Sequence, residues 1–259
     1  MAGDAGFDIL LARLSDRRKL GIAALAGLAE VAESELQMVL RGGVPSPSLL
    51  RQLAPALRLH AADLFAIAGG AVPDDLAPVD TAAGKCVPRL VRHAMLLPTQ
   101  KRSDLRRLVA SLPQAERAQP PPRPPVHEQY PAGPGALLLR MLRNRNLGWT
   151  GIAQTFLLVT GRYWSASTYG MVGHGRTPLT PELLVDFSTV LGIPANDLVA
   201  LTGVALSGGP PAPEPVAAGV AELIWDVRRL TAHQLRRASA VAESMWQQLP
   251  DRQSDGPAS

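Results

Sequence analysis

Apolar residues recur along most of the chain three and four positions apart, which is the spacing of one face of an α-helix. Two equivalent stripes of this kind consist of Leu50, Leu53 and Leu57, and of Leu184, Phe187 and Leu191. Ser46-Pro47 precedes the first stripe, and Thr180-Pro181 precedes the second. A hydroxyl residue followed by proline is typical of a helix start, because the hydroxyl caps the first turn and the fixed φ of proline suits the first helical position. No segment sustains the alternation of a strand, so we predict an all-α fold.

The stripes belong to a repeat that covers most of the chain. Arg18 recurs as Arg145 at an offset of 127 residues, and Asp63 recurs as Asp197 at an offset of 134. The offset grows because the second copy contains an insertion of six residues and another of one residue. Matches that keep the same order indicate two copies of one unit. Each copy predicts five short helices followed by a helical extension.

The repeat divides the chain into segments with different predicted roles. We predict helical units at residues 1–84 and 135–209, helical extensions at residues 85–112 and 210–250, a proline-rich linker at residues 113–134, and a disordered tail at residues 251–259. The prolines between Gln119 and Pro125 require an extended backbone and cannot continue a helix. This segment is therefore a spacer or, as the alternative, a ligand for a proline-binding domain.

The second and third predicted helices of each unit carry a more specific pattern. In the first unit, Leu25-Ala26 is followed by aliphatic residues at Val31, Leu36 and Val39. This pattern resembles the phage-repressor and Cro-like (XRE) helix-turn-helix family. The resemblance covers residues 7–69 and 135–203. It implies two repressor-like five-helix domains, in which the third helix lies in the major groove of DNA and the start of the second helix meets phosphate.

In the first unit, the resemblance places the recognition helix from about Glu33 to Arg41. Its outward residues are then Glu33, Ser34, Gln37 and Arg41, while Leu36 and Val39 face inward. Gln37 would pair with adenine, and Arg41 would contact phosphate. Two acids, Glu33 and Glu35, oppose this role, since they lie in a unit with 7 basic and 10 acidic residues, a net charge of −3.

In the second unit, the resemblance places the recognition helix at Ala166–His174, with Ser165 as its N-cap. Tyr169 and Val172 take the inward positions. The residues expected to contact DNA are Arg162, Ser165, Ser167, Thr168, His174 and Arg176, and the further arginines expected near phosphate are Arg140, Arg143 and Arg145. Gly170 disfavours the helix by about 1 kcal/mol relative to alanine, and the six-residue insertion lengthens the turn between the two helices. We nevertheless expect this set to contribute more than that of the first unit.

Charge and the two extensions add further candidate surfaces. The chain has a net charge of +4, and residues 85–134 alone carry +6. The basic residues of the first extension are Arg89, Arg92, Lys101, Arg102, Arg106 and Arg107. They either solvate an exposed helix face or add phosphate contacts without sequence preference. The last predicted helix, Ala232 to Leu249, has an apolar stripe that packs either within the chain or across a homodimer. The stripe consists of Leu235, Ala238, Ala242, Met245 and Trp246.

Other chemistries lack their usual residues. A single cysteine excludes a disulfide framework, and the five histidines share no metal-ligand spacing. No phosphate-binding loop and no catalytic triad stand out, so we expect no enzyme activity and no cofactor. Apolar runs of about 18 residues and a signal peptide are both missing, which predicts a cytoplasmic protein that does not enter a membrane. The Ala-, Leu-, Arg- and Pro-rich composition suggests a bacterium with a GC-rich genome.

Together these patterns predict a sequence-specific regulator of transcription that binds double-stranded DNA. The alternative is a protein-interaction adaptor built from helix-turn-helix units that no longer bind DNA. The acidic first recognition helix and the lengthened second turn favour that alternative. The dependence of DNA affinity on salt distinguishes the two, because each neutralised phosphate steepens it. The sequence leaves open the operator and any small-molecule effector.

Overall fold

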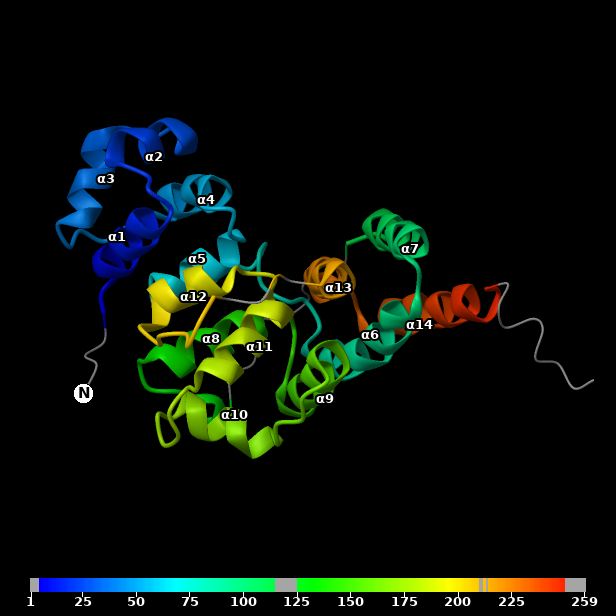
Figure 1. The fold of residues 1–259 in the computed structure, drawn as a ribbon. Helices are drawn as coiled ribbons and strands as arrows, with labels where there is room; N and C mark the ends of the chain where they lie inside the picture. The colour runs from blue at the N-terminus through cyan, green and yellow to red at the C-terminus, as the bar shows by residue number, and fades with distance from the viewer. Residues whose placement is uncertain (1–4, 115–124, 210–211, 213, 250–259) are drawn as a thin grey trace, which may run out of the picture.

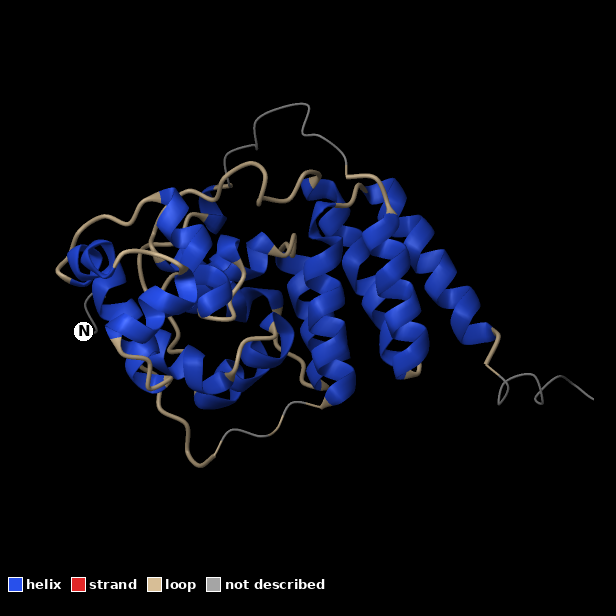
Figure 2. Ribbon diagram, turned by 90° about the horizontal axis from the view of Figure 1, so that it is seen from above, coloured by secondary structure: helices blue, strands red, loops and turns tan. Residues whose placement is uncertain are grey.

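The computed structural model describes residues 5–114, 125–209, 212 and 214–249 (Figure 1). Within these ranges the regular structure is helical and no strand is present (Figure 2), which confirms the all-α prediction. Most of the proline run at residues 119–125 and the whole tail at residues 251–259 lie outside the described residues. Among the described helices, none combines the length and the apolar character needed to cross a membrane.

Two sets of five helices follow each other in the same order. The first set comprises α1 (Phe7–Arg17), α2 (Ile22–Ala29), α3 (Glu33–Leu40), α4 (Pro47–Ala56) and α5 (Ala61–Ile67). The second set comprises α8 (Pro134–Asn144), α9 (Trp149–Thr160), α10 (Ala166–Gly173), α11 (Pro181–Leu191) and α12 (Ala195–Thr202). The helices expected at Glu33–Arg41 and Ala166–His174 are therefore present as α3 and α10.

The two extensions pack on each other as a four-helix bundle. It comprises α6 (Val87–Leu96), α7 (Thr99–Ser111), α13 (Pro215–Asp226) and α14 (Ala232–Gln247). Three short 3₁₀ segments accompany the helices, η1 (Thr81–Cys86), η2 (Val126–Glu128) and η3 (Val227–Arg229). Helix α6 packs on α14 and α7 packs on α13. Leu235, Ala238 and Ala242 of α14 are buried there, so the predicted stripe packs within the chain.

Local capping accounts for several of the helix starts. The hydroxyl of Ser46 accepts from the backbone N–H of Leu49 at 3.1 Å at the start of α4, and Thr180 accepts from Leu183 at 3.3 Å at the start of α11. Helix α14 begins with a full capping box, in which the side chains of Thr231 and Gln234 each accept from the other's backbone N–H. Each cap satisfies an N–H that has no partner inside the helix.

The two five-helix sets meet in a reciprocal way. Helix α1 of the first set packs on α12 of the second, and α8 of the second set packs on α5 of the first. In the repeat, α1 corresponds to α8 and α5 corresponds to α12. Exchanging the two sets therefore maps one contact onto the other, as in the isologous interface of a symmetric dimer. One chain thus contains an internal pseudo-two-fold arrangement.

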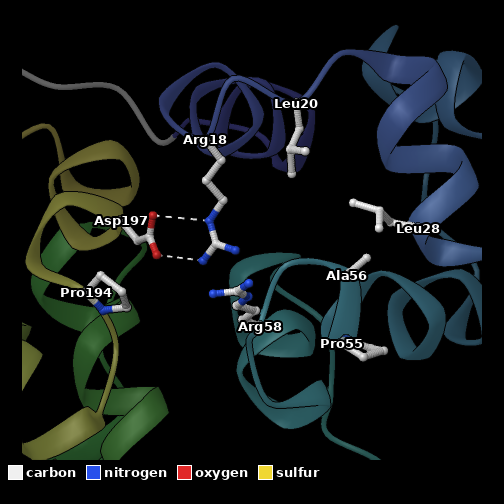
Figure 3. Close-up of a pocket in the computed structure, with 8 residues that line it drawn as sticks. All are labelled: Arg18, Leu20, Leu28, Pro55, Ala56, Arg58, Pro194 and Asp197. Carbon is white, nitrogen blue, oxygen red and sulfur yellow. Dashed lines mark hydrogen bonds and ion pairs between the residues drawn. The ribbon is translucent and has the colours of Figure 1, made fainter.

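Two ion pairs at this interface obey the same reciprocity. Arg145 donates to both carboxylate oxygens of Asp63 at 2.8 Å, and both side chains have no exposed surface. The counterpart is formed by Arg18, which donates to the two oxygens of Asp197 at 2.6 and 3.3 Å (Figure 3). Those side chains keep 16% and 6% of their surface exposed. The four charges therefore join the two sets, and one pair is fully desolvated.

The bundle and the insertion break the symmetry. Helix α6 packs on α9, and α13 packs on α11, so the bundle lies against the second set (Figure 1). Helix α9 has 12 residues whereas α2 has 8, and five residues instead of three separate it from the next helix. The six inserted residues are thus four in the helix and two in the loop. The insertion lengthens the helix before α10 by about one turn.

Candidate functional site

The outward side of α3 carries the residues expected to contact DNA in the first set. Leu36 and Val39 are buried, as predicted, and anchor the helix, which packs on α1 and α2. Ser34 and Arg41 are exposed and Gln37 is half-buried. Helical periodicity places these residues away from the two anchors. Their side chains are therefore accessible to a partner molecule.

Two apolar side chains beside this surface were not among the expected contacts. Met38 is 56% exposed within α3, and Val44 is 91% exposed in the loop that follows. Two acids also belong to α3. Glu33 is exposed, and Glu35 accepts a long hydrogen bond of 3.4 Å from the hydroxyl of Ser46. The surface of α3 is thus mixed in character, and Arg41 supplies the single positive charge between residues 33 and 41.

At the start of α10, the three expected hydroxyl groups are bonded to one another. The hydroxyl of Ser165 accepts from the backbone N–H of Thr168 at 3.2 Å, which makes it the predicted N-cap. The same oxygen lies 2.8 Å from the hydroxyl of Ser167 and 2.9 Å from that of Thr168. Ser167 is exposed, while Ser165 and Thr168 are half-buried. A partner molecule would reach this cluster first at Ser167.

Aromatic side chains cover the middle and the end of α10. The indole of Trp149 lies against Gly170, where an added Cβ would approach the ring to 2.7 Å, and Tyr130 lies against Gly173 at the same distance. The two rings are linked, because Trp149 donates its indole N–H to the Tyr130 hydroxyl at 3.0 Å. Gly170 is therefore explained by packing, since a larger residue would displace Trp149. In the repeat, Gly170 of α10 corresponds to Gln37 of α3.

The last expected contact of α10 is also engaged within the chain. His174 Nε2 lies 3.1 Å from the backbone carbonyl oxygen of His127 in η2. Its ring meets that of Tyr130 edge to face, with centroids 5.0 Å apart. The segment before α8 therefore holds the end of α10 in place. Of the two predicted recognition helices, α3 therefore has a more accessible outward side than α10.

The arginines expected near phosphate around α10 have different environments. For Arg145 the expectation is wrong, because its guanidinium is fully buried against Asp63 and has no surface to offer to phosphate. Arg143 is paired with a carboxylate of η2. Arg176 is exposed, Arg140 is half-buried, and Arg162 is 52% exposed beside α11.

A buried carboxylate of α11 ties down the inserted loop. Asp186 accepts from the indole N–H of Trp164 at 2.7 Å and lies 3.7 Å from the guanidinium of Arg162. Burial raises the pKa of Asp186, and the hydrogen bond from Trp164 and the charge of Arg162 act against that rise. These contacts fix the loop immediately before Ser165 and so set the start of α10.

Three of the six basic residues of the first extension, Arg89, Arg102 and Arg106, make contacts within the bundle. Arg102 is buried and donates to the carbonyl oxygens of Ala94 at 3.1 Å and Leu97 at 2.7 Å, which end α6. Arg106 is paired with two acids of α13, and Arg89 with an acid of α14. Arg102 therefore fits neither alternative offered for the stretch, a solvated face or a phosphate surface, because it is buried. For the exposed residues Arg89, Arg92, Lys101 and Arg107 both alternatives stay open. The acidic partners of Arg89 and Arg106 lie far away in sequence, on the other extension.

In the part of the chain that the structure describes, no group of three or more His, Cys, Asp or Glu residues is arranged to hold a metal ion. Compared with protein-family models, with curated proteins and with solved structures, the chain matches none of them.

Proposed function

We propose that this chain is a sequence-specific DNA-binding regulator of transcription, in which α2 with α3 and α9 with α10 form two helix-turn-helix motifs. The observation that supports the proposal most is the reciprocal contact of the two five-helix sets. Helix-turn-helix proteins commonly bind as two-fold dimers, each subunit presenting one recognition helix to a half-site. Here a single chain supplies both sets in a pseudo-two-fold arrangement, with α3 and α10 on opposite sides of the α5 and α12 pair (Figure 1). The proposal therefore needs no homodimer.

Within this proposal, α3 makes the main contacts to bases. Its side chains at Ser34, Gln37 and Arg41 are accessible, whereas Gly170 and Gly173 of α10 lie beneath aromatic rings. Gln37 has the two-sided amide that pairs with adenine, and Arg41 has a charge for phosphate. The proposal therefore gives the first set the larger part in DNA contact, whereas the sequence had favoured the second set. Helix α10 contributes through Ser167 and the nearby arginines, which position the chain on the backbone of DNA.

The test is selection of bound fragments from random double-stranded DNA by the full-length chain, followed by affinity measurements on the enriched site. We expect an enriched motif whose affinity falls steeply between about 50 and 200 mM salt. Gln37→Ala should relax the preference at one base pair by about 1–3 kcal/mol. Arg41→Ala should weaken binding to all sequences alike and reduce the salt slope by about 1.

Arg51→Ala is the matched control for Arg41→Ala. It removes the same charge from the first set, but Arg51 lies on α4 and is paired with Asp75 at 2.8 Å. We expect its DNA affinity to stay within about twofold of the unchanged chain, since surface pairs of this kind contribute little. No enriched motif, or equal effects of Arg41→Ala and Arg51→Ala, would reject the assignment of α3.

The mixed surface of α3 favours a second candidate function, a protein-interaction adaptor. Met38 and Val44 are exposed beside two acids, which is unusual for a helix that approaches a polyanion. Exposed apolar side chains rimmed by polar residues are typical of protein contacts. An adaptor predicts that the full-length chain enriches no DNA motif and that Met38→Lys abolishes capture of a partner protein. A DNA-binding regulator predicts instead that Met38→Lys leaves binding intact or strengthens it.

A further inference from the structure

A cavity opens between the two five-helix sets, beside the Arg18–Asp197 ion pair (Figure 3). Its volume is about 650 Å³, which is in the range of small-molecule sites. Its apolar lining consists of Leu20, Leu28, Pro55, Ala56 and Pro194, and its charged lining of Arg18, Arg58 and Asp197. Residues of both sets therefore form its walls, so a bound molecule would touch both.

The cavity has more positive charge than the chain neutralises. Arg18 uses its Nε and one terminal nitrogen on Asp197. Arg58 extends into the same space (Figure 3), and no hydrogen bond or ion pair of its side chain is found among the described residues. Two guanidinium groups thus face one carboxylate. An anionic group would find unused N–H donors there.

Arg58 also occupies a position whose backbone conformation suits glycine. Its φ is +44°, in the left-handed region, where a residue with a Cβ is strained. Its counterpart in the second set, at the offset of 134, is Gly192 with a φ of +69°. The same turn is thus built with glycine in one set and with arginine in the other. The first set thus places a guanidinium at the cavity where the second set has no side chain.

The equivalent place in the second half of the interface is already filled by the chain. The indole of Trp225 stacks on the ring of His60 at 3.6 Å, and the guanidinium of Arg228 lies 3.7 Å from the indole centroid. Arg145 lies 5.3 Å from the same centroid. His60 and Arg145 are the counterparts of two residues that line the cavity, Pro194 and Arg18. The cavity is therefore the open twin of a site that holds a planar aromatic ring beside a guanidinium.

We propose that this cavity binds a small aromatic carboxylate. The aromatic ring lies against Pro194, as Trp225 lies against His60. The carboxylate is bound by Arg58 and by the free N–H groups of Arg18, which Asp197 leaves unused. The proposal does not depend on DNA binding, since it concerns the cavity between the two sets and not the outward side of α3.

Calorimetric titration of the full-length chain tests the proposal, with benzoate, phenylacetate and indole-3-acetate as probes. We expect saturable binding of at least one of them, and weaker binding by about tenfold or more for the matching neutral ring compound and for acetate. Arg58→Gly should lower the affinity of that probe by about tenfold or more. The same variant should raise the thermal midpoint, because glycine relieves the strain, so loss of binding cannot come from unfolding.

Lys19→Gly is the matched control. Lys19 is an exposed cation of the first set with a φ of +56°, and it does not line the cavity. Its replacement also relieves left-handed strain and removes one charge, so we expect it to leave probe affinity within about twofold. The proposal is overturned if no probe binds up to about 10 mM, if neutral ring compounds bind as well as the acids, or if Arg58→Gly and Lys19→Gly weaken binding equally.

Discussion

Replacement of Arg145 by methionine tests whether the buried ion pair holds the two five-helix sets together. Methionine keeps a long flexible side chain but removes the guanidinium. Arg145 makes two hydrogen bonds of 2.8 Å to Asp63 and donates to the carbonyl oxygens of Met141 and Leu191 at 2.9 and 2.8 Å. The variant therefore leaves a carboxylate and two carbonyl groups without their main partner in a site with no exposed surface.

The expected loss follows from that burial. Breaking a fully buried ion pair by removing one partner typically destabilises a protein by about 3–5 kcal/mol. After the change, the carboxylate of Asp63 keeps only a long contact of 3.4 Å from the amide of Asn144. Arg18→Met is the symmetry-matched control, and we expect it to lose about 1 kcal/mol because water still reaches that pair. The double replacement Arg145→Met with Asp63→Leu should recover about 2 kcal/mol, since no charge is then buried alone.

Urea unfolding followed by far-ultraviolet circular dichroism measures these differences, with all four chains compared at one pH and one salt concentration. We expect the order of stability to be unchanged chain, Arg18→Met, double variant and Arg145→Met. Equal losses for Arg145→Met and Arg18→Met would refute the claim that desolvation sets the difference. A double variant that is less stable than Arg145→Met would refute the claim that the lone carboxylate is the cause.

Two further predictions concern a buried ring and a packed glycine. Burial, together with the charge of Arg145, lowers the pKa of His60 from 6.5 to about 4. As the pH falls, His60 is therefore protonated in the unfolded chain at a higher pH than in the folded chain. The free energy of unfolding should fall as the pH falls from 6.5 toward 4. Urea unfolding should show a loss of at most about 2 kcal/mol from this group between about pH 7 and about pH 5, and His60→Gln should remove it, whereas an unchanged pH dependence would contradict the shift. Gly170→Ala should destabilise by about 1–3 kcal/mol because its Cβ meets the ring of Trp149 at 2.7 Å. Gly27 is a helical glycine with open space around it, so Gly27→Ala is the control and should stabilise the chain by about 0.5–1 kcal/mol. If the thermal midpoints of Gly170→Ala and Gly27→Ala change in the same direction, Trp149 shifts aside and the packing argument is wrong.

Local sequence predicted the elements well because local interactions set them. The hydroxyl caps at Ser46, Ser165 and Thr231 bond backbone groups within three residues. The inward positions of Leu36 and Tyr169, which the family resemblance implied, are buried. The repeat also contained a signal for the interface that we did not use. Both an arginine and an aspartate recur in the two copies, which is what a reciprocal pair of ion pairs requires.

The candidate site was less predictable because access to it depends on distant segments. Ser167 and Gln37 are accessible, as expected, but Trp149 covers Gly170, and the end of α10 is held by residues that precede α8. Nothing in the sequence distinguishes Arg58 from any other surface arginine. Only the structure shows that its side chain extends into the cavity beside Arg18, where the counterpart Gly192 has no side chain.

The sequence by itself determined that the chain is helical, where its helices begin, which faces are apolar and that one unit occurs twice. Only the tertiary structure decided which arginines are buried and which carboxylates they pair with. Arg145 and Asp63 lie 82 residues apart, and Arg106 and Asp226 lie 120 residues apart. An arginine pattern in sequence is the same whether the side chain meets water, phosphate or a buried carboxylate. The difference comes from desolvation, which only a partner brought close by packing can offset.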